Sequence, residues 1–103
     1  MEKIIQNNID KIKELCLLHK VKSLSLFGSI TKNKFNSDSD IDFLVAFDNM
    51  SHVEYADNYF ILIEKLESLL KRKIDLVTDK SLSNPYLINS INKSKVHIYG
   101  QPN

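Results

Sequence analysis

The sequence predicts an α/β fold in which helices pack on a small mixed β-sheet. Short segments rich in β-forming residues alternate along the chain with segments whose apolar residues recur every three or four positions. The chain has 103 residues, of which 43% are hydrophobic and 26% charged, a composition typical of folded globular proteins. A chain of this length supports one hydrophobic core, so we expect residues 1–103 to form a single domain.

Charge, cysteine content and hydropathy exclude several classes of protein. Fourteen Lys and Arg against 13 Asp and Glu leave a formal charge of +1, so no overall field attracts nucleic acid or an anionic membrane. Cys16 is the single cysteine, which excludes an intrachain disulfide framework. No apolar run is long enough to span a membrane. We therefore expect a cytoplasmic protein that binds neither membranes nor nucleic acid directly.

The N-terminal half is expected to contain one helix and two strands. Residues 1 to about 20 have an apolar stripe at helical spacing, formed by Ile5, Ile9, Ile12 and Cys16. Residues 23–27 alternate polar with apolar side chains and stop at Gly28, which predicts a short strand. Polar turn residues at 36–39 then precede a second strand at 41–47, rich in β-forming residues.

The C-terminal half is expected to contain two helices and two strands. Ser51 and Glu54 have the spacing of a capping box at the start of a long helix. Its apolar stripe consists of Val53, Ala56, Phe60, Ile63, Leu66 and Leu70. A strand at 74–78, a short helix that Asn84 caps and a last strand at 96–99 follow. The long helix provides enough chain to connect two parallel strands.

Two groups of side chains, one on this long helix and one at its C-terminal end, have both a structural and a functional interpretation. An aromatic group on this helix, Tyr55, Tyr59 and Phe60, extends beyond the apolar stripe, to which only Phe60 belongs, and serves either the core or a partner interface. Cations at 71–73 could contact a phosphate, but a solvated helix end, where the helix dipole favours positive charge, explains them better.

Three aspartates are candidates for metal binding. Asp40 and Asp42 are two residues apart at the start of a strand, so their side chains share one face, and Asp75 joins them if its strand pairs alongside. Two carboxylates about 4 Å apart repel by roughly 4 kcal/mol at an effective dielectric constant near 20. A divalent cation such as Mg²⁺ would neutralise such a cluster. The alternative is structural: Asp40 and Asp42 would be solvated or capping side chains near a turn, and Asp75 would be an outward-facing residue of its strand.

Gly28 and Ser29 are candidates for phosphate binding. A glycine at a strand end followed by a small hydroxyl residue lets backbone N–H groups approach a phosphate closely, although a simple turn has the same appearance. Their distance from the aspartates completes the pattern G-S-x(10)-D-x-D.

With this pattern the sequence resembles the minimal nucleotidyltransferases of the polymerase-β-like superfamily. The resemblance covers nearly the whole chain, and its matching segments are 26–29, 39–45, 73–77 and 98–100. It implies the polymerase-β-like fold, with ATP as substrate and two Mg²⁺ ions as cofactors. The implied roles are phosphate contacts for Gly28, Ser29 and Lys32, and metal binding and catalysis for Asp40, Asp42 and Asp75. Asp75 would be the general base.

Three positions depart from the family pattern. Family members often continue as Gly-Ser-Arg-x-Arg-Gly, whereas this chain has Ile30 and Lys32 at the arginine positions and Asn33 at the last glycine position. Ile30 has no charge to offer a phosphate, and Lys32 keeps the charge without the two-pronged geometry of a guanidinium.

The resemblance also implies a biological role. Small nucleotidyltransferases of this type are often antitoxins that transfer AMP from ATP to a tyrosine of a HEPN ribonuclease toxin, with which they form a hetero-oligomer. One alternative is an antitoxin with little or no activity, which neutralises the toxin by covering it. Another is a generic interaction domain with a solvated acidic cluster.

Overall fold

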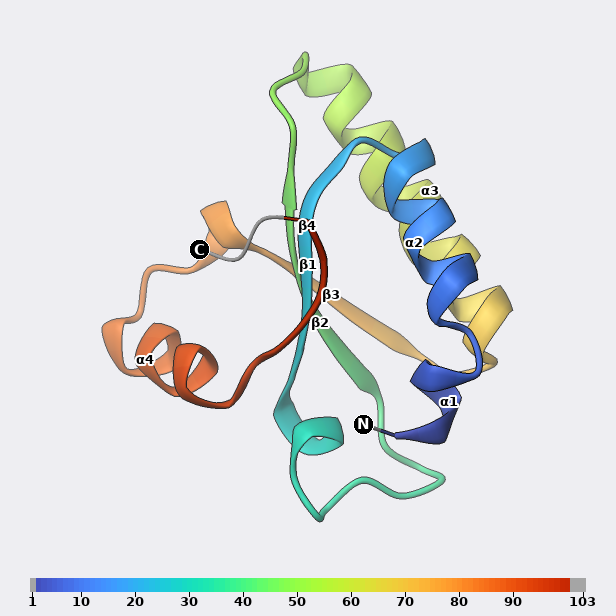
Figure 1. Cartoon of the computed structure of the whole chain (residues 1–103). Coiled ribbons are helices and arrows are strands. Elements are labelled where there is room, and N and C mark those ends of the chain that lie inside the picture. The colour runs from blue at the N-terminus through green and yellow to red at the C-terminus, as the bar shows by residue number, and fades with distance from the viewer. Residues whose placement is uncertain (1, 101–103) are drawn as a thin grey trace.

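The computed structural model describes residues 2–100, and its four strands form one mixed sheet in the order β3-β2-β1-β4 (Figure 1). The strands are β1 (Val21–Phe27), β2 (Ile41–Phe47), β3 (Ile74–Thr78) and β4 (Val96–Gly100). β1 runs antiparallel to both of its neighbours, while β2 and β3 are parallel. The predicted α/β fold with a small mixed sheet is therefore confirmed.

Helices lie on both sides of this sheet. They are α1 (Lys3–Gln6), α2 (Ile9–Leu18), α3 (His52–Leu70) and α4 (Pro85–Ser94), with short 3₁₀ turns η1 (Gly28–Thr31) and η2 (Asp79–Ser81). Figure 1 shows α2 and α3 together on one side of the sheet and α4 on the other. Within residues 2–100, no helix is both long and apolar enough to cross a membrane.

The core lies between the sheet and the α2–α3 layer. Alternate residues of β2, namely Ile41, Phe43 and Val45, are fully buried, and they belong to one cluster with Ile12 and Leu62 of the two helices. Burial of each such side chain contributes about 1.5–3 kcal/mol. Because side chains alternate along a strand, the residues between them, including Asp42, project from the opposite face of the sheet.

The N-terminal helix differs from the prediction of one helix from residue 1 to about residue 20. The structure divides this segment into α1 and α2, with a break at Asn7 and Asn8. Asn8 Nδ2 donates a hydrogen bond of 2.8 Å to the carbonyl oxygen of Ile4, so the side chain competes with the helical backbone pattern. Met1 lies outside the described residues.

The long helix α3 begins as predicted, but its buried face was predicted wrongly at three positions. The backbone N–H of Glu54 donates to Ser51 Oγ at 3.2 Å, which confirms the cap. Ala56, however, is exposed. Val53 and Phe60 are 72% and 66% exposed, and Leu62 is buried instead. At about 100° per residue, Val53 and Phe60 lie almost opposite Leu62 around the helix axis. The helix therefore presents a second, exposed apolar face.

Candidate active site

The pairing of β2 with β3 places two of the three candidate aspartates side by side. Asp42 and Asp75 are direct partners in the parallel register. Their neighbours Phe43 and Leu76 are buried in the core, so both carboxylates project from the sheet face opposite α2 and α3. The sequence predicted this juxtaposition only on the condition that the two strands pair, and they do.

Burial and the two neighbouring carboxylates change the acidity of Asp42. The pKa of Asp42 is raised from 3.8 to about 6. Partial burial is the largest cause, followed by the charges of Asp75 and Asp40 and a hydrogen bond with Asp75. Asp40 itself is exposed, immediately before β2. The three aspartates therefore share one electrostatic site, with Asp42 at its centre.

Gly28 brings the phosphate-binding candidate to the same place. Phe27 pairs with Asp42 in the antiparallel register, so the turn at the end of β1 begins beside that carboxylate. Gly28 has φ +76°, and a β-carbon added to it would lie 2.2 Å from Asp42 Oδ2. Both the conformation and the space require glycine. Thr31 Oγ1 donates to the Gly28 carbonyl at 2.8 Å, which stabilises the turn.

The carboxylates fit a divalent cation by their chemistry. Among residues 2–100, no three His, Cys, Asp or Glu side chains form a preassembled metal site. Magnesium, however, usually binds one or two carboxylates and completes its shell with water and substrate phosphates. The adjacent pair Asp42 and Asp75 matches that demand. Burial is the largest cause of the raised pKa of Asp42, and the charges of Asp75 and Asp40, which a cation would neutralise, add to it.

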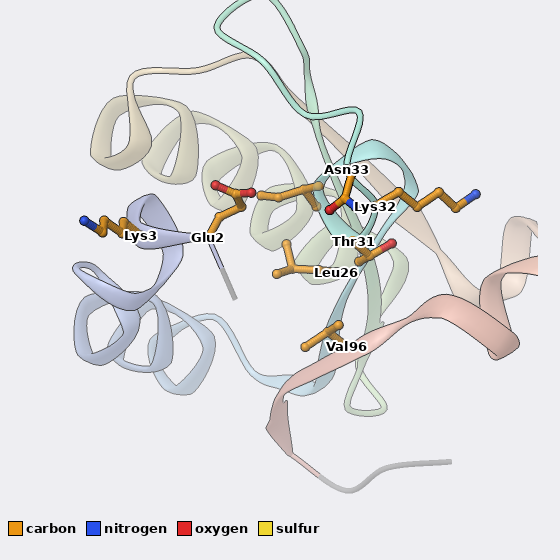
Figure 2. Close-up of a pocket in the computed structure, with 8 residues that line it drawn as sticks. Glu2, Lys3, Leu26, Thr31, Lys32, Asn33 and Val96 are labelled. Atoms are coloured by element: carbon orange, nitrogen blue, oxygen red, sulfur yellow. The ribbon is translucent and has the colours of Figure 1, made fainter.

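Lys32 lies beside a different hollow from the aspartates. A pocket of about 500 Å³ next to η1 is lined by Lys32, Leu26 and Val96 among others, and neither Asp42 nor Asp75 lines it. Figure 2 shows the Lys32 side chain extending away from Glu2, and Lys32 is exposed. Ile30 is 6% exposed and belongs to the core, so it anchors η1 by packing. The role of Lys32 in nucleotide binding stays a prediction.

Arg72 has a structural role that the prediction of a solvated helix end missed. Its Nη2 atom donates to the carbonyl oxygens of Asn36, at 2.6 Å, and Ser39, and its guanidinium lies 4.6 Å from the ring centre of Phe35. Arg72 thus fastens the loop that leads into Asp40. Because the partners are more than 30 positions apart in sequence, no local pattern could reveal this contact.

Tyr59 is a second residue whose role the sequence did not reveal. Its hydroxyl donates a hydrogen bond of 2.7 Å to the carbonyl oxygen of Leu76, the residue after Asp75. Burial raises the pKa of Tyr59, and the charge of Asp75 raises it further. The hydroxyl therefore stays protonated as a donor and ties α3 to the strand that carries Asp75.

Residues 9–98 match the family model described as the nucleotidyltransferase domain. The chain belongs to the nucleotidyltransferase domain family. The matched segment includes the Gly28 turn and all three aspartates, so the geometry described above is that of a nucleotidyltransferase domain.

Two relatives of this nucleotidyltransferase domain carry names that specify an acceptor class. A proposed protein adenylyltransferase of Methanocaldococcus jannaschii is 38% identical over 98 residues, which cover 87% of this chain and 97% of the relative. The protein adenylyltransferase MntA of Thermococcus cleftensis is 30% identical over 84 residues, which cover 74% of this chain and 82% of the relative.

Solved structures with the same fold include toxin–antitoxin complexes. A toxin–antitoxin structure with AMP-PNP has a TM-score of 0.70 and 29% identity, and covers 91% of this chain and 74% of that one. A complex of tri-AMPylated Shewanella oneidensis HEPN toxin with MNT antitoxin has a TM-score of 0.64 and 28% identity, and covers 93% and 72%. A proposed minimal nucleotidyltransferase has a TM-score of 0.75 and 26% identity, and covers 89% and 90%.

Proposed function

We propose that this chain is a single-domain, cytoplasmic protein adenylyltransferase that transfers AMP from ATP to a tyrosine hydroxyl of a HEPN-type toxin and thereby acts as its antitoxin. The observation that carries the proposal is the convergence of Gly28, Asp42 and Asp75 on one face of the sheet. The names of the relatives and the AMPylated toxin in one neighbouring structure support the choice of acceptor.

Each residue has a role that follows from its place. The η1 turn presents backbone N–H groups and the Ser29 hydroxyl to the phosphates, which Gly28 permits because it has no side chain. Asp40, Asp42 and Asp75 would hold Mg²⁺, two ions in the full site. When bound, Mg²⁺ supplies charge neutralisation of the triphosphate and lowers the pKa of the attacking hydroxyl. AMP-PNP in a neighbouring structure supports a nucleoside triphosphate as the donor.

The proposed reaction is a single displacement at phosphorus. The tyrosine oxygen attacks the α-phosphorus of ATP and forms a new O–P bond. The bond from the α-phosphorus to the bridging oxygen breaks, and pyrophosphate leaves with that electron pair. Asp75 accepts the hydroxyl proton and releases it to water, because its side chain is exposed. The products are AMP-tyrosine, pyrophosphate and one proton.

A second candidate function is neutralisation of the toxin by binding alone. One observation favours it: Ile30 is 6% exposed, so a position that is often arginine in the family contributes packing and no charge to the nucleotide site. In that case the same fold would cover the toxin, and nucleotide would be unnecessary.

One experiment separates the two functions. The protein is incubated with Mg²⁺, ATP labelled at the α-phosphate and the HEPN-type product of a neighbouring gene, and label on toxin tyrosine and residual ribonuclease activity are both measured. Asp42→Asn tests the site, and Asp48→Asn, an exposed carboxylate at the other end of the same strand, is the matched control.

If the protein transfers AMP, the toxin becomes labelled and loses its ribonuclease activity. Asp42→Asn then abolishes both effects, and Asp48→Asn leaves both unchanged. If the toxin is neutralised without being labelled, and Asp42→Asn still neutralises it, the result would support neutralisation by binding alone in place of adenylyl transfer. Label transfer that survives Asp42→Asn would contradict the assigned role of Asp42.

A further inference from the structure

A groove runs along the free edge of the sheet, next to the candidate catalytic pair. It has a volume of about 470 Å³ and lies between α3 and the strand β3 with its following turn η2. Tyr55, Tyr59 and Phe60 line it from the helix, and Asp75 and Val77 line it from the strand. The groove therefore ends at a carboxylate of the proposed active site.

One aromatic residue of this groove, Phe60, is not explained by packing of the core, whereas Tyr55 and Tyr59 are partly buried against it. Phe60 is 66% exposed, and its ring packs edge to face on Tyr59 with ring centres 5.2 Å apart. The largest core contribution of α3 comes from Leu62, Leu66 and Leu70, none of which lines the groove. An exposed aromatic side chain, packed on a half-buried one beside a functional carboxylate, is typical of a contact surface.

The order of the strands identifies which substrate the groove receives. The proposed phosphate turn follows β1, Asp42 lies in β2, and Asp75 lies in β3, so the donor side and the groove are on opposite sides of the acidic pair. A displacement at phosphorus needs the acceptor to approach from the side opposite the leaving group. The groove is therefore on the acceptor side.

The charge of the groove favours a polypeptide over a nucleic acid as acceptor. The described residues that line it include one carboxylate, Asp75, and no lysine or arginine. Lys80 approaches the rim, with its Nζ 5.7 Å from the ring centre of Tyr55. Binding of a nucleic acid backbone depends on contacts between cations and phosphates, which this lining does not offer.

We propose that the α3–β3 groove is the acceptor docking site, in which Phe60 and Tyr59 bind the apolar residues that flank the tyrosine to be modified in the toxin. This inference rests on the proposed adenylyl transfer and extends it to the surface that selects the substrate. Phe60 contacts neither nucleotide nor metal in this arrangement, so it is a specificity residue.

The test is a steady-state and binding comparison of Phe60→Ser with Leu17→Ser. Leu17 is 73% exposed on α2 and does not line the groove, so it is a matched control for loss of an exposed apolar side chain. The measurements are the KM for toxin, the KM for ATP and the Kd of the toxin complex without nucleotide. Equal melting temperatures of the two variants show that both are folded.

We expect Phe60→Ser to raise the KM and Kd for toxin at least tenfold, a size typical of a buried aromatic contact, with the KM for ATP within about twofold of wild type. Leu17→Ser is expected to resemble wild type, and Phe60→Tyr to retain most of the affinity. Wild-type toxin kinetics in Phe60→Ser would overturn the groove assignment alone. A wild-type protein that neither binds nor labels the toxin would overturn adenylyl transfer and the groove with it. Efficient labelling of a short RNA that depends on Phe60 would assign the groove to nucleic acid and contradict this proposal.

Discussion

Gly28 touches Asp42 so closely that the two residues act as one structural unit. A β-carbon at position 28 would lie 2.2 Å from Asp42 Oδ2, and the backbone there has φ +76°. The glycine of the proposed phosphate turn and the central carboxylate of the acidic site are therefore locked together, across the pairing of β1 with β2. A change at either residue is expected to affect the other.

Gly28→Ala is expected to abolish transfer while costing only part of the stability. The new methyl group must displace the Asp42 carboxylate, and the left-handed backbone adds a strain of about 1–2 kcal/mol. Gly100→Ala is the control, because Gly100 has φ +83° and even less space, with the Lys22 carbonyl oxygen 1.8 Å from an added β-carbon, away from the aspartates. We expect both variants to have lowered melting temperatures, with toxin labelling lost only in Gly28→Ala. Full activity in Gly28→Ala would contradict the linkage.

Asp42 is expected to destabilise the metal-free protein at neutral pH. Its folded-state pKa is about 6, raised from 3.8, so between these values the folded state binds more protons than the unfolded state, and stability falls as pH rises. Asp42→Asn has no ionisable group at this position and so does not lose stability in this way. We expect its free energy of unfolding to equal that of the wild type near pH 4 and to exceed it by about 1 kcal/mol above pH 6, a figure reduced for solvent screening at this partly exposed site. Urea denaturation at both pH values with EDTA measures the difference.

Mg²⁺ is expected to reverse that destabilisation. A cation that binds the ionised carboxylates of the folded state raises the free energy of unfolding by mass action. At pH 7 we expect the melting temperature of the wild type to rise with millimolar Mg²⁺ and that of Asp42→Asn to change much less. Equal shifts in both proteins would indicate that Mg²⁺ binds elsewhere.

The sequence predicted the parts of the fold that depend on local pattern. The strand at 41–47 was predicted with its observed bounds, as was the Ser51 cap, because alternation and capping are encoded within a few residues. The break at Asn8 was missed, since it depends on one side-chain hydrogen bond. The exposure of Phe60 was missed because the helix carries more apolar residues than one face can bury.

The candidate site was predictable to the extent that motif spacing determines it. Gly28, Asp40 and Asp42 lie close in sequence, so a short pattern includes all three. Asp75 joins them only through the pairing of β2 with β3, which the chain does not specify locally. Arg72 and Tyr59 were not identified as supports of the site, because their partners are distant carbonyl oxygens without any sequence signature.

Arg72→Lys is expected to loosen the loop before Asp40 although it conserves the charge. Lysine lacks the planar, weakly hydrated guanidinium that lies on the Phe35 ring while its Nη2 atom donates to the Asn36 and Ser39 carbonyl oxygens. We expect a loss of about 1–2 kcal/mol in stability and faster amide exchange in residues 35–39. Lys73→Arg, at a neighbouring exposed cation, is the control. Unchanged exchange in the loop of Arg72→Lys would contradict this role.

Tyr59→Phe is expected to slow transfer without weakening nucleotide binding. The variant keeps the ring in the groove but removes the 2.7 Å hydrogen bond to the Leu76 carbonyl, which holds the edge strand beside Asp75. Loss of such a bond costs about 1 kcal/mol, and the less restrained Asp75 meets the acceptor proton in the right geometry less often. We expect kcat to fall several-fold with the KM for ATP unchanged, whereas Tyr86→Phe, at an 87% exposed tyrosine on α4, behaves as wild type. If the kcat of Tyr59→Phe equalled that of the wild type, the Tyr59 hydroxyl would not be needed to position β3 and Asp75.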